Sequence, residues 1–362
     1  MKLTAENLKA LLTQIKHPID DSNFIETVEI SKIEDNESRV LVEVQSGYPM
    51  NSILGTLRES IIREIEKTET VKQVDVQFCC NIVAHSTQRN IGLLPEIKNI
   101  IAIASGKGGV GKSTTAVNLA LALSKEGSKV GLLDADIYGP SQQRMLGLTG
   151  RPDSPDGKKI SPMIKFGLQT MSIGLLVEED TPMVWRGPMV TSALEQLLRD
   201  TQWQNLDYLV VDLPPGTGDI QLTLSQKVPL TGAIIVTTPQ DIALLDAKKA
   251  LKMFEKVGVP IIGIMENMST HICQKCGHEE AIFGSGGGEK MSQDYEVSLL
   301  GQLPLKSSIR LQTDSGEPTV IADPDGAVSR KYHEIALKVG LKISRLAKDR
   351  KNVFPKIVVQ NS

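Results

Sequence analysis

The stretch GKGGVGKST, at residues 106–114, constrains the fold of this chain more than any other. It lies between the apolar run NIIAIAS, an expected strand, and STTAVNLALALSKEG, an expected helix. It fits G-x-x-x-x-G-K-[ST], in which backbone N–H groups surround phosphate oxygens at the positive end of the helix. A glycine-rich turn without a ligand is the alternative. The expected nucleotide-binding residues are Gly106, Lys107, Gly108, Gly109, Val110, Gly111, Lys112, Ser113 and Thr114.

Two acidic strand ends complete the predicted site. In the usual pattern Lys112 reaches the β- and γ-phosphates and Ser113 holds Mg²⁺. Asp134 and Asp136 follow one apolar run and Asp212 ends another, where ligands of open α/β sheets bind. Each carboxylate alone is an ordinary loop residue. Together with the P-loop, we expect Asp212 to hold Mg²⁺ through water, Asp136 to position the attacking water and Asp134 to lie near Mg²⁺, with the last two roles exchangeable.

The chain beyond residue 98 alternates short, wholly apolar runs with expected helices. The runs are NIIAIAS, KVGLLDAD, DYLVVDL, GAIIVTTP and PIIGIMEN. Continuous Val, Ile and Leu are what strands buried on both faces require, and the alternation predicts parallel strands with helices on both sides. We therefore expect an α/β fold, a parallel-sheet P-loop NTPase domain, over residues 99–362.

The first 88 residues have a different pattern. Apolar residues recur at helical spacing near residues 8–15 and 53–65, and the segments FIETVEI, RVLVEV and VKQVDVQF indicate strands. The order α-β-β-α-β predicts a small α+β domain with its helices on one face of a short sheet. Residues 89–98 would form a linker.

Composition and charge argue against several classes of protein for this chain. A chain with 40% apolar and 23% charged residues is typical of globular proteins, and its formal net charge of −3 argues against nucleic acid as a partner. No run is long enough to span a bilayer, and the start has no signal-peptide pattern. Four cysteines are too few for a disulfide framework, so we expect a cytoplasmic protein. The basic segment EIALKVGLKISRLAKDRKN is interpreted as a packed final helix, without stable membrane association.

The segment HICQKCGHEE, residues 271–280, carries a second kind of site. Cys273 and Cys276 have the spacing at which two thiolates bind one metal ion or one iron of a cluster, and such sites usually have four ligands. A zinc knuckle completed by His271 or His278 is one possibility. Two buried cysteines without a metal are another, which the polar, glycine-rich character of the segment argues against.

A second pair of cysteines, Cys79 and Cys80, ends the third expected strand of the first domain. Adjacent side chains in a strand point to opposite faces, so the two thiols cannot easily hold one metal. We interpret them as packing residues.

Seven segments together resemble one family. The chain has, in that family's order and spacing, SGKGGVGKST, LLDADIYGPS, MVWRGPM, VVDLPPGTGD, ENMS, CQKCG and IFGSGGGEKM. These are similar to the Mrp/ApbC-type iron–sulfur cluster carrier ATPases over roughly residues 99–330. The first domain is similar to the small MIP18-like domain that many of these proteins carry before the ATPase.

The resemblance implies a function. It implies a homodimeric ATPase that uses ATP and Mg²⁺, holds a labile [4Fe-4S] cluster on Cys273 and Cys276 of two copies, and passes it from a cluster donor to apo iron–sulfur proteins. Lys107, directly after the first P-loop glycine, marks the deviant Walker A group and resembles a finger that reaches the partner subunit's nucleotide. Asn267, in ENMS, is expected to contact adenine.

The first domain departs from its family pattern. His17 and Tyr48 stand where Asp and Cys are often found, which argues against a metal role there and leaves open a docking role for targets or cluster donors. Two other functions are weighed against the carrier. One is a spatial-organising ATPase of the partition or septum type with a zinc knuckle, and the other is a redox ATPase, resembling nitrogenase reductase, that keeps its cluster.

Overall fold

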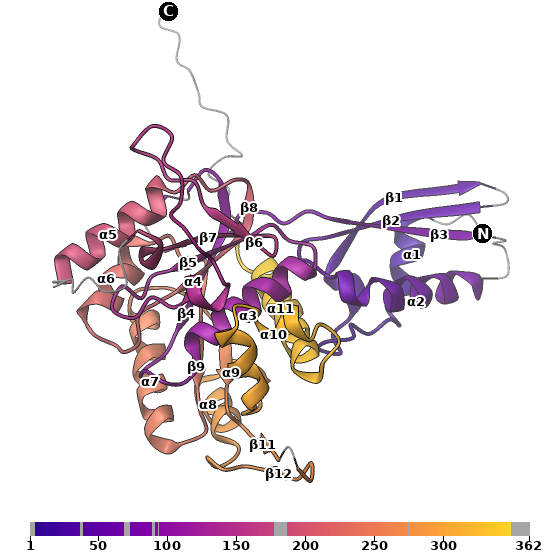
Figure 1. Ribbon diagram of the computed structural model, residues 1–362. Helices are drawn as coiled ribbons and strands as arrows, with labels where there is room; N and C mark the ends of the chain where they lie inside the picture. The colour runs from indigo at the N-terminus through magenta and orange to yellow at the C-terminus, as the bar shows by residue number, and fades with distance from the viewer. Residues whose placement is uncertain are drawn as a thin grey trace, which may run out of the picture.

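The computed structural model contains two parts, each built on a β-sheet, and a long C-terminal helix packs against both of them (Figure 1). A three-stranded sheet belongs to the N-terminal part and an eight-stranded sheet to the larger part, as the sequence predicts. The structure describes residues 4–36, 39–68, 73–88, 91–92, 94–176, 187–273 and 275–348. Within these ranges no helix is long and apolar enough to cross a membrane.

The large sheet has the strand order β13-β10-β9-β4-β8-β5-β7-β6. All neighbouring pairs are parallel except β6 and β7, so the predicted parallel sheet is confirmed. The order sets β4 beside β8 and β8 beside β5, which brings the ends of these three strands together. The strands are β4 (Ile97–Ala104), β5 (Val130–Asp134), β6 (Met163–Lys165), β7 (Leu168–Ser172), β8 (Leu206–Asp212), β9 (Gly232–Thr237), β10 (Ile261–Glu266) and β13 (Leu299–Gln302).

Helices cover both faces of this sheet. Along β4, Ile101 and Ile103 pack in the core with α3 and α11, whereas Ile100 and Ala102 pack in the core with α5 and α7. This two-sided burial explains why the strands are apolar at every position. The helices are α3 (Lys112–Lys125), α4 (Gln142–Met145), α5 (Gly187–Asp200), α6 (Asp219–Lys227), α7 (Asp241–Lys256), α8 (Gly287–Tyr295), α9 (Ser307–Asp314), α10 (Thr319–Ala322) and α11 (Ala327–Ser344).

The N-terminal module, residues 4–80, has the predicted α-β-β-α-β order. Its central strand β2 pairs antiparallel with β1 and parallel with β3. Burial alternates along β2, so the helices cover one face of the sheet and the other face is open, as predicted. The elements are α1 (Ala5–Leu12), β1 (Val28–Asn36), β2 (Arg39–Ser46), α2 (Leu54–Glu66) and β3 (Val74–Cys80).

Helix α11 belongs to both parts. Leu337 and Leu341 pack in the core of the N-terminal module, while Ile335 and Val339 pack in the core of the large sheet. Gly340 permits the close approach, since a Cβ there would lie 2.9 Å from Pro49 Cδ. The predicted final helix is therefore packed, which confirms that interpretation for α11; residues 349–362 lie outside the described residues.

One expectation about the N-terminal segments needs correction. Cys79 and Cys80 are both exposed, so burial in a core is not their role; Cys80 donates its thiol hydrogen to the Tyr48 carbonyl at 3.3 Å. The chain just before the predicted linker is held against the large domain, because Gln88 Nε2 donates to the Ser225 carbonyl at 2.6 Å and to the Val228 carbonyl at 3.0 Å.

Candidate functional site

The phosphate-binding loop begins where β4 ends. Its glycines are required by space and backbone shape: Gly109 and Gly111 have φ of +82° and +84°. A Cβ on Gly106 would lie 2.1 Å from the backbone of Asp246 in α7, and one on Gly111 would lie 2.1 Å from Asn267 Nδ2. Helix α3 starts directly afterwards at Lys112. The loop thus aims its N–H groups and the helix N-terminus at one point.

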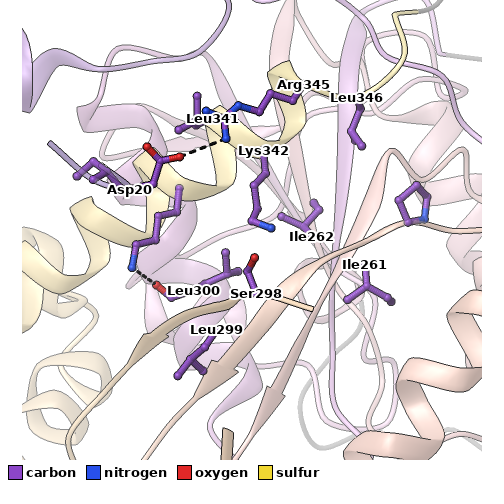
Figure 2. Close-up of a pocket in the computed structure, with 13 residues that line it drawn as sticks. Asp20, Ile261, Ile262, Ser298, Leu299, Leu300, Leu341, Lys342, Arg345 and Leu346 are labelled. Atoms are coloured by element: carbon purple, nitrogen blue, oxygen red, sulfur yellow. Dashed lines mark hydrogen bonds and ion pairs between the residues drawn. The ribbon is translucent and has the colours of Figure 1, made fainter. Parts of the chain in front are cut away.

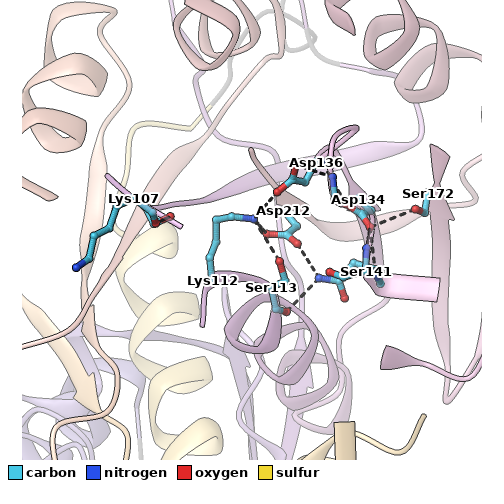
Figure 3. A network of polar contacts seen from close by, with 11 residues as sticks. Lys107, Lys112, Ser113, Asp134, Asp136, Ser141, Ser172 and Asp212 are labelled. Carbon is cyan, nitrogen blue, oxygen red and sulfur yellow. Dashed lines mark hydrogen bonds and ion pairs between the residues drawn. The ribbon is translucent and has the colours of Figure 1, made fainter. Parts of the chain in front are cut away.

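The predicted lysine and carboxylates meet beside this loop (Figure 3). Lys112 Nζ forms a buried ion pair with Asp212 Oδ1 and lies 3.9 Å from Asp136 Oδ2 and 3.3 Å from Ser113 Oγ. These residues come from the ends of β4, β5 and β8, which the sheet order sets side by side. The structure therefore brings these predicted residues together, and their roles stay predictions.

Asp134 is held by the loop that follows it. Its oxygens accept hydrogen bonds from the backbone N–H groups of Asp136, Ser141 and Gln142 at 3.1, 2.8 and 3.0 Å, and from Ser172 Oγ at 3.2 Å. Burial, followed by the neighbouring Asp212 charge, raises the pKa of Asp134 to about 7. This carboxylate fixes residues 134–142 in place.

Asp136 is the carboxylate on the Lys112 side of that loop (Figure 3). It accepts a hydrogen bond from the Gly139 backbone N–H at 3.3 Å. Burial raises its pKa, an effect that the Lys112 charge opposes. Its position beside the lysine suits the handling of a water molecule better than the position of Asp134 does.

Gln142 is a site residue that the sequence reasoning missed. Its buried Nε2 donates to Asp212 Oδ2 at 2.8 Å and to the Ser113 carbonyl at 3.0 Å. Gln142 therefore fixes the second oxygen of Asp212 while Lys112 holds the first. The signal available in the sequence was its place at the end of DADIYGPSQ, within the loop that carries Asp134 and Asp136.

Lys107 lies in the loop, and Asn267 contacts the loop from the segment after β10. The Lys107 side chain points away from Lys112 and the carboxylates (Figure 3), and among the described residues it has no ion-pair partner. Asn267 Nδ2 donates to the Val110 carbonyl at 2.9 Å, and its Oδ1 accepts from the Met268 N–H at 2.9 Å. The amide keeps one hydrogen and one lone pair for a base.

The two predicted cysteines sit on a small hairpin, here called the cysteine hairpin (residues 271–280), that projects from the body beside α8 (Figure 1). It is built from β11 (His271–Ile272) and β12 (Glu279–Glu280). Cys273 is partly buried and Cys276 is exposed. Backbone N–H groups of Cys276 and Lys275, followed by the Cys276 thiol, lower the pKa of Cys273. The turn thus favours the thiolate form, which binds metals.

The hairpin offers two ligands to a metal. His271 Nδ1 lies 3.2 Å from the Leu305 carbonyl, so that ring is oriented by the backbone. Over the described part of the chain, no three His, Cys, Asp or Glu side chains are grouped so that they could hold a metal ion. Among the residues that the structure describes, this arrangement gives a zinc ion within one protomer the two thiols and no third ligand.

The P-loop, the acidic strand ends and the parallel sheet define a P-loop NTPase. Solved structures agree on the class. A nucleotide-binding protein from Archaeoglobus fulgidus, in complex with ADP, is 34% identical with a TM-score of 0.56, over 64% of this chain and 90% of its own. The septum site-determining protein MinD from Pyrococcus horikoshii, complexed with Mg-ADP, shares the fold at 23% identity and a TM-score of 0.50, over 66% of this chain and 94% of its own.

Within the P-loop NTPases, further comparisons identify the family of this chain. Residues 96–340 match the model of the NUBPL iron-transfer P-loop NTPase, and residues 5–77 match that of an iron-sulfur cluster assembly protein. An iron-sulfur cluster carrier protein of Escherichia coli is 50% identical over 92% of this chain and 90% of its own. The mouse iron-sulfur cluster transfer protein NUBPL is 52% identical over 67% of this chain and 77% of its own. The chain belongs to the NUBPL iron-transfer P-loop NTPase family.

Proposed function

We propose that this P-loop ATPase carries a labile [4Fe-4S] cluster, bound by Cys273 and Cys276 of two copies, and transfers it to apo iron–sulfur proteins. The observation that carries the proposal is the hairpin turn with two adjacent free thiols, which would supply half of a four-ligand site. The names of the relatives from Escherichia coli and mouse support it. All four cysteines are free, which suits a reducing compartment such as the cytoplasm.

The nucleotide half of the cycle follows from the site geometry. The Ser113 hydroxyl and the Asp212 carboxylate are oxygen donors of the kind Mg²⁺ prefers, so this donor set fits the ion. Lys112 would exchange Asp212 for the β- and γ-phosphates, while Gln142 keeps Asp212 oriented. Asp136 would position the attacking water and Asp134 would hold the loop. Asn267 would contact adenine with its remaining hydrogen and lone pair.

A homodimer would couple ATP hydrolysis to the binding and release of the cluster. Lys107 points away from its own carboxylate cluster, as a residue that serves a partner subunit's nucleotide would. Large apolar side chains are exposed near the site: Tyr138 (60%) in the loop after β5, and Ile242 (70%) and Leu245 (56%) in α7, which contacts the P-loop. A dimer interface on this side of the domain would cover these apolar side chains. Nucleotide turnover would then change how the four thiolates meet.

Two rival functions remain distinguishable. A spatial-organising ATPase leaves the cysteine hairpin only the structural role of a zinc knuckle, and the likeness to MinD extends to the fold alone. A redox ATPase would keep its cluster and reduce it reversibly. The exposed position of Cys276 favours a cluster that leaves, because solvent and partner thiols can reach the ligands.

Anaerobic reconstitution with iron and sulfide, followed by transfer to an apo-acceptor with and without ATP, tests the proposal. We expect the cluster absorbance to move to the acceptor, with a rate that depends on ATP. The Cys276→Ser variant serves as the matched control and should accept no cluster. A reconstituted cluster that cycles between redox states yet never reaches the acceptor would support the redox alternative instead.

A further inference from the structure

A cavity of about 550 Å³ lies between the N-terminal module, α11 and the large sheet (Figure 2). Its sheet side is formed where β10 and β13 begin, at Ile261 and Leu299. The nucleotide site lies at the opposite, carboxyl ends of the parallel strands, so the cavity is separate from it. Its volume falls in the range of small-molecule sites, about 300–1,000 Å³.

The cavity combines an apolar floor with cationic walls. Ile261, Ile262, Leu299, Leu300 and Leu341 supply apolar surface. The charged groups that line the cavity are Lys338 and Lys342 from α11, Arg345 directly after that helix, and Asp20 from the N-terminal module. Three cations thus face one carboxylate.

Two of the cations already have partners. Arg345 binds Asp20 at 3.2 Å and Ser22 Oγ at 3.1 Å, and Lys338 Nζ donates to the Leu300 carbonyl at 3.0 Å (Figure 2). Lys342 runs from α11 toward Ile262 and Ser298, and within the described ranges its ammonium group has no ion-pair or hydrogen-bond partner. Burial, followed by the Arg345 charge, lowers the pKa of Lys342, while Asp20 opposes this effect more weakly.

We propose that this cavity binds a small amphipathic carboxylate, whose head pairs with Lys342 Nζ and whose apolar body lies on Ile261, Ile262 and Leu299. An anion there compensates a half-buried charge that the protein leaves uncompensated, and the apolar body covers hydrophobic surface. The chain's own last residues, 349–362, are poorly suited as the occupant, because they contain three basic residues and one acidic residue. A ligand is therefore expected from outside the chain.

The position of the cavity gives the ligand a physical consequence. Asp20 belongs to the N-terminal module and Ile261 to the large sheet, so a molecule between them contacts both parts at once. Binding stabilises the arrangement of the two parts that creates the cavity. The site does not depend on cluster binding or on ATP hydrolysis.

Octanoate is the probe, measured by isothermal titration calorimetry on the full-length protein. We expect one saturable site per chain, and affinity at least about tenfold weaker in Lys342→Met, as loss of a charge-assisted hydrogen bond implies. Octan-1-ol, with the same apolar body and no charge, should bind more weakly than octanoate. Lys129→Met removes an exposed lysine that lines no part of the cavity and should bind octanoate like the wild type.

A second variant separates shape from charge. Ser298→Phe places a ring at the exposed rim of the cavity, keeps all charges and should also weaken octanoate binding. Basal ATP hydrolysis should be unchanged in Lys342→Met. The proposal is overturned if octanoate shows no saturable binding, if Lys342→Met and Lys129→Met bind it equally, or if octan-1-ol binds as tightly as octanoate.

Discussion

The nucleotide site and the cysteine hairpin differ in how much of each site one chain supplies. Lys112 and Asp212 are buried at strand ends, and both oxygens of Asp212 have partners within the chain. Cys276 is exposed on a hairpin of two-residue strands, and the described chain provides two thiolates there. Under the proposed function, the residues for ATP hydrolysis are fixed at the ends of sheet strands, whereas the thiols that would bind and release the cluster lie in an exposed hairpin.

The most damaging change to the nucleotide site is Lys112→Gln. It removes the positive charge beside Asp212 and the expected phosphate contact, so hydrolysis should fall by about 10²–10³-fold or more, as loss of a transition-state donor implies. Cluster binding should survive while ATP-dependent transfer is lost. Steady-state phosphate release and iron content are the measurements. Loss of iron together with hydrolysis would break the comparison, because it would mean that the two sites are not separable.

The converse change is Cys276→Ser. Cluster binding should be abolished, with ATP hydrolysis within about twofold of wild type and thermal stability nearly unchanged, because exposed substitutions usually alter the free energy of unfolding by less than about 0.5 kcal/mol. Iron analysis, hydrolysis and thermal unfolding test this. The control is Cys79→Ala, which removes an exposed thiol of the N-terminal module and should leave cluster binding intact.

Gln142→Ala sharpens the account of the nucleotide site. Loss of the Nε2 contact frees one oxygen of Asp212, and we expect kcat to fall about tenfold with little change in KM, the size of one hydrogen bond to a charged group. Gln143→Ala is the matched control, because Gln143 contacts Ser172 and Pro140 and not Asp212. Equal losses of kcat in both variants would show that only the loop fold matters.

The smallest expected effect is a change in thiol titration. Because the Cys276 and Lys275 N–H groups lower the pKa of Cys273, its alkylation by iodoacetamide in the metal-free protein should begin at lower pH than that of an ordinary thiol such as glutathione. The thiolate is the form that reacts with iodoacetamide, and it predominates above the pKa. A lowered pKa therefore shifts the onset of alkylation to lower pH. Mass spectrometry of labelled peptides across pH measures it. A profile matching glutathione would show that the turn does not prepare Cys273 for iron.

The sequence predicted the large sheet well because its signals are local. Val, Ile and Leu runs mark β4, β5, β8, β9 and β10, and the glycines of the P-loop fix the position of the phosphate site. The antiparallel hairpin of β6 and β7 and the short edge strand β13 carry weaker patterns and were not predicted. Short strands at or near a sheet edge depend on neighbours that the sequence does not name.

Contacts between distant segments were the part that sequence reasoning could not reach. Gln142 becomes a site residue because its loop meets Asp212, 70 positions away. Leu337 and Leu341 give α11 its second role because the N-terminal module folds against it. Cys79 and Cys80 are both exposed at the end of β3 although adjacent strand side chains point to opposite faces, which the strand pattern alone did not predict. Cys273 and Cys276 lie in one turn, as their spacing predicts, and their role as cluster ligands stays a prediction.

The central claim is that one chain supplies half of a cluster site. The most direct measurement is iron, sulfide and zinc content together with native mass under anaerobic conditions. The account predicts about two iron and two sulfide per chain in a dimer, the share of one [4Fe-4S] cluster held by four thiolates, with dissociation or cluster loss in Cys273→Ser. One zinc per chain in a monomer, with no sulfide, would contradict it.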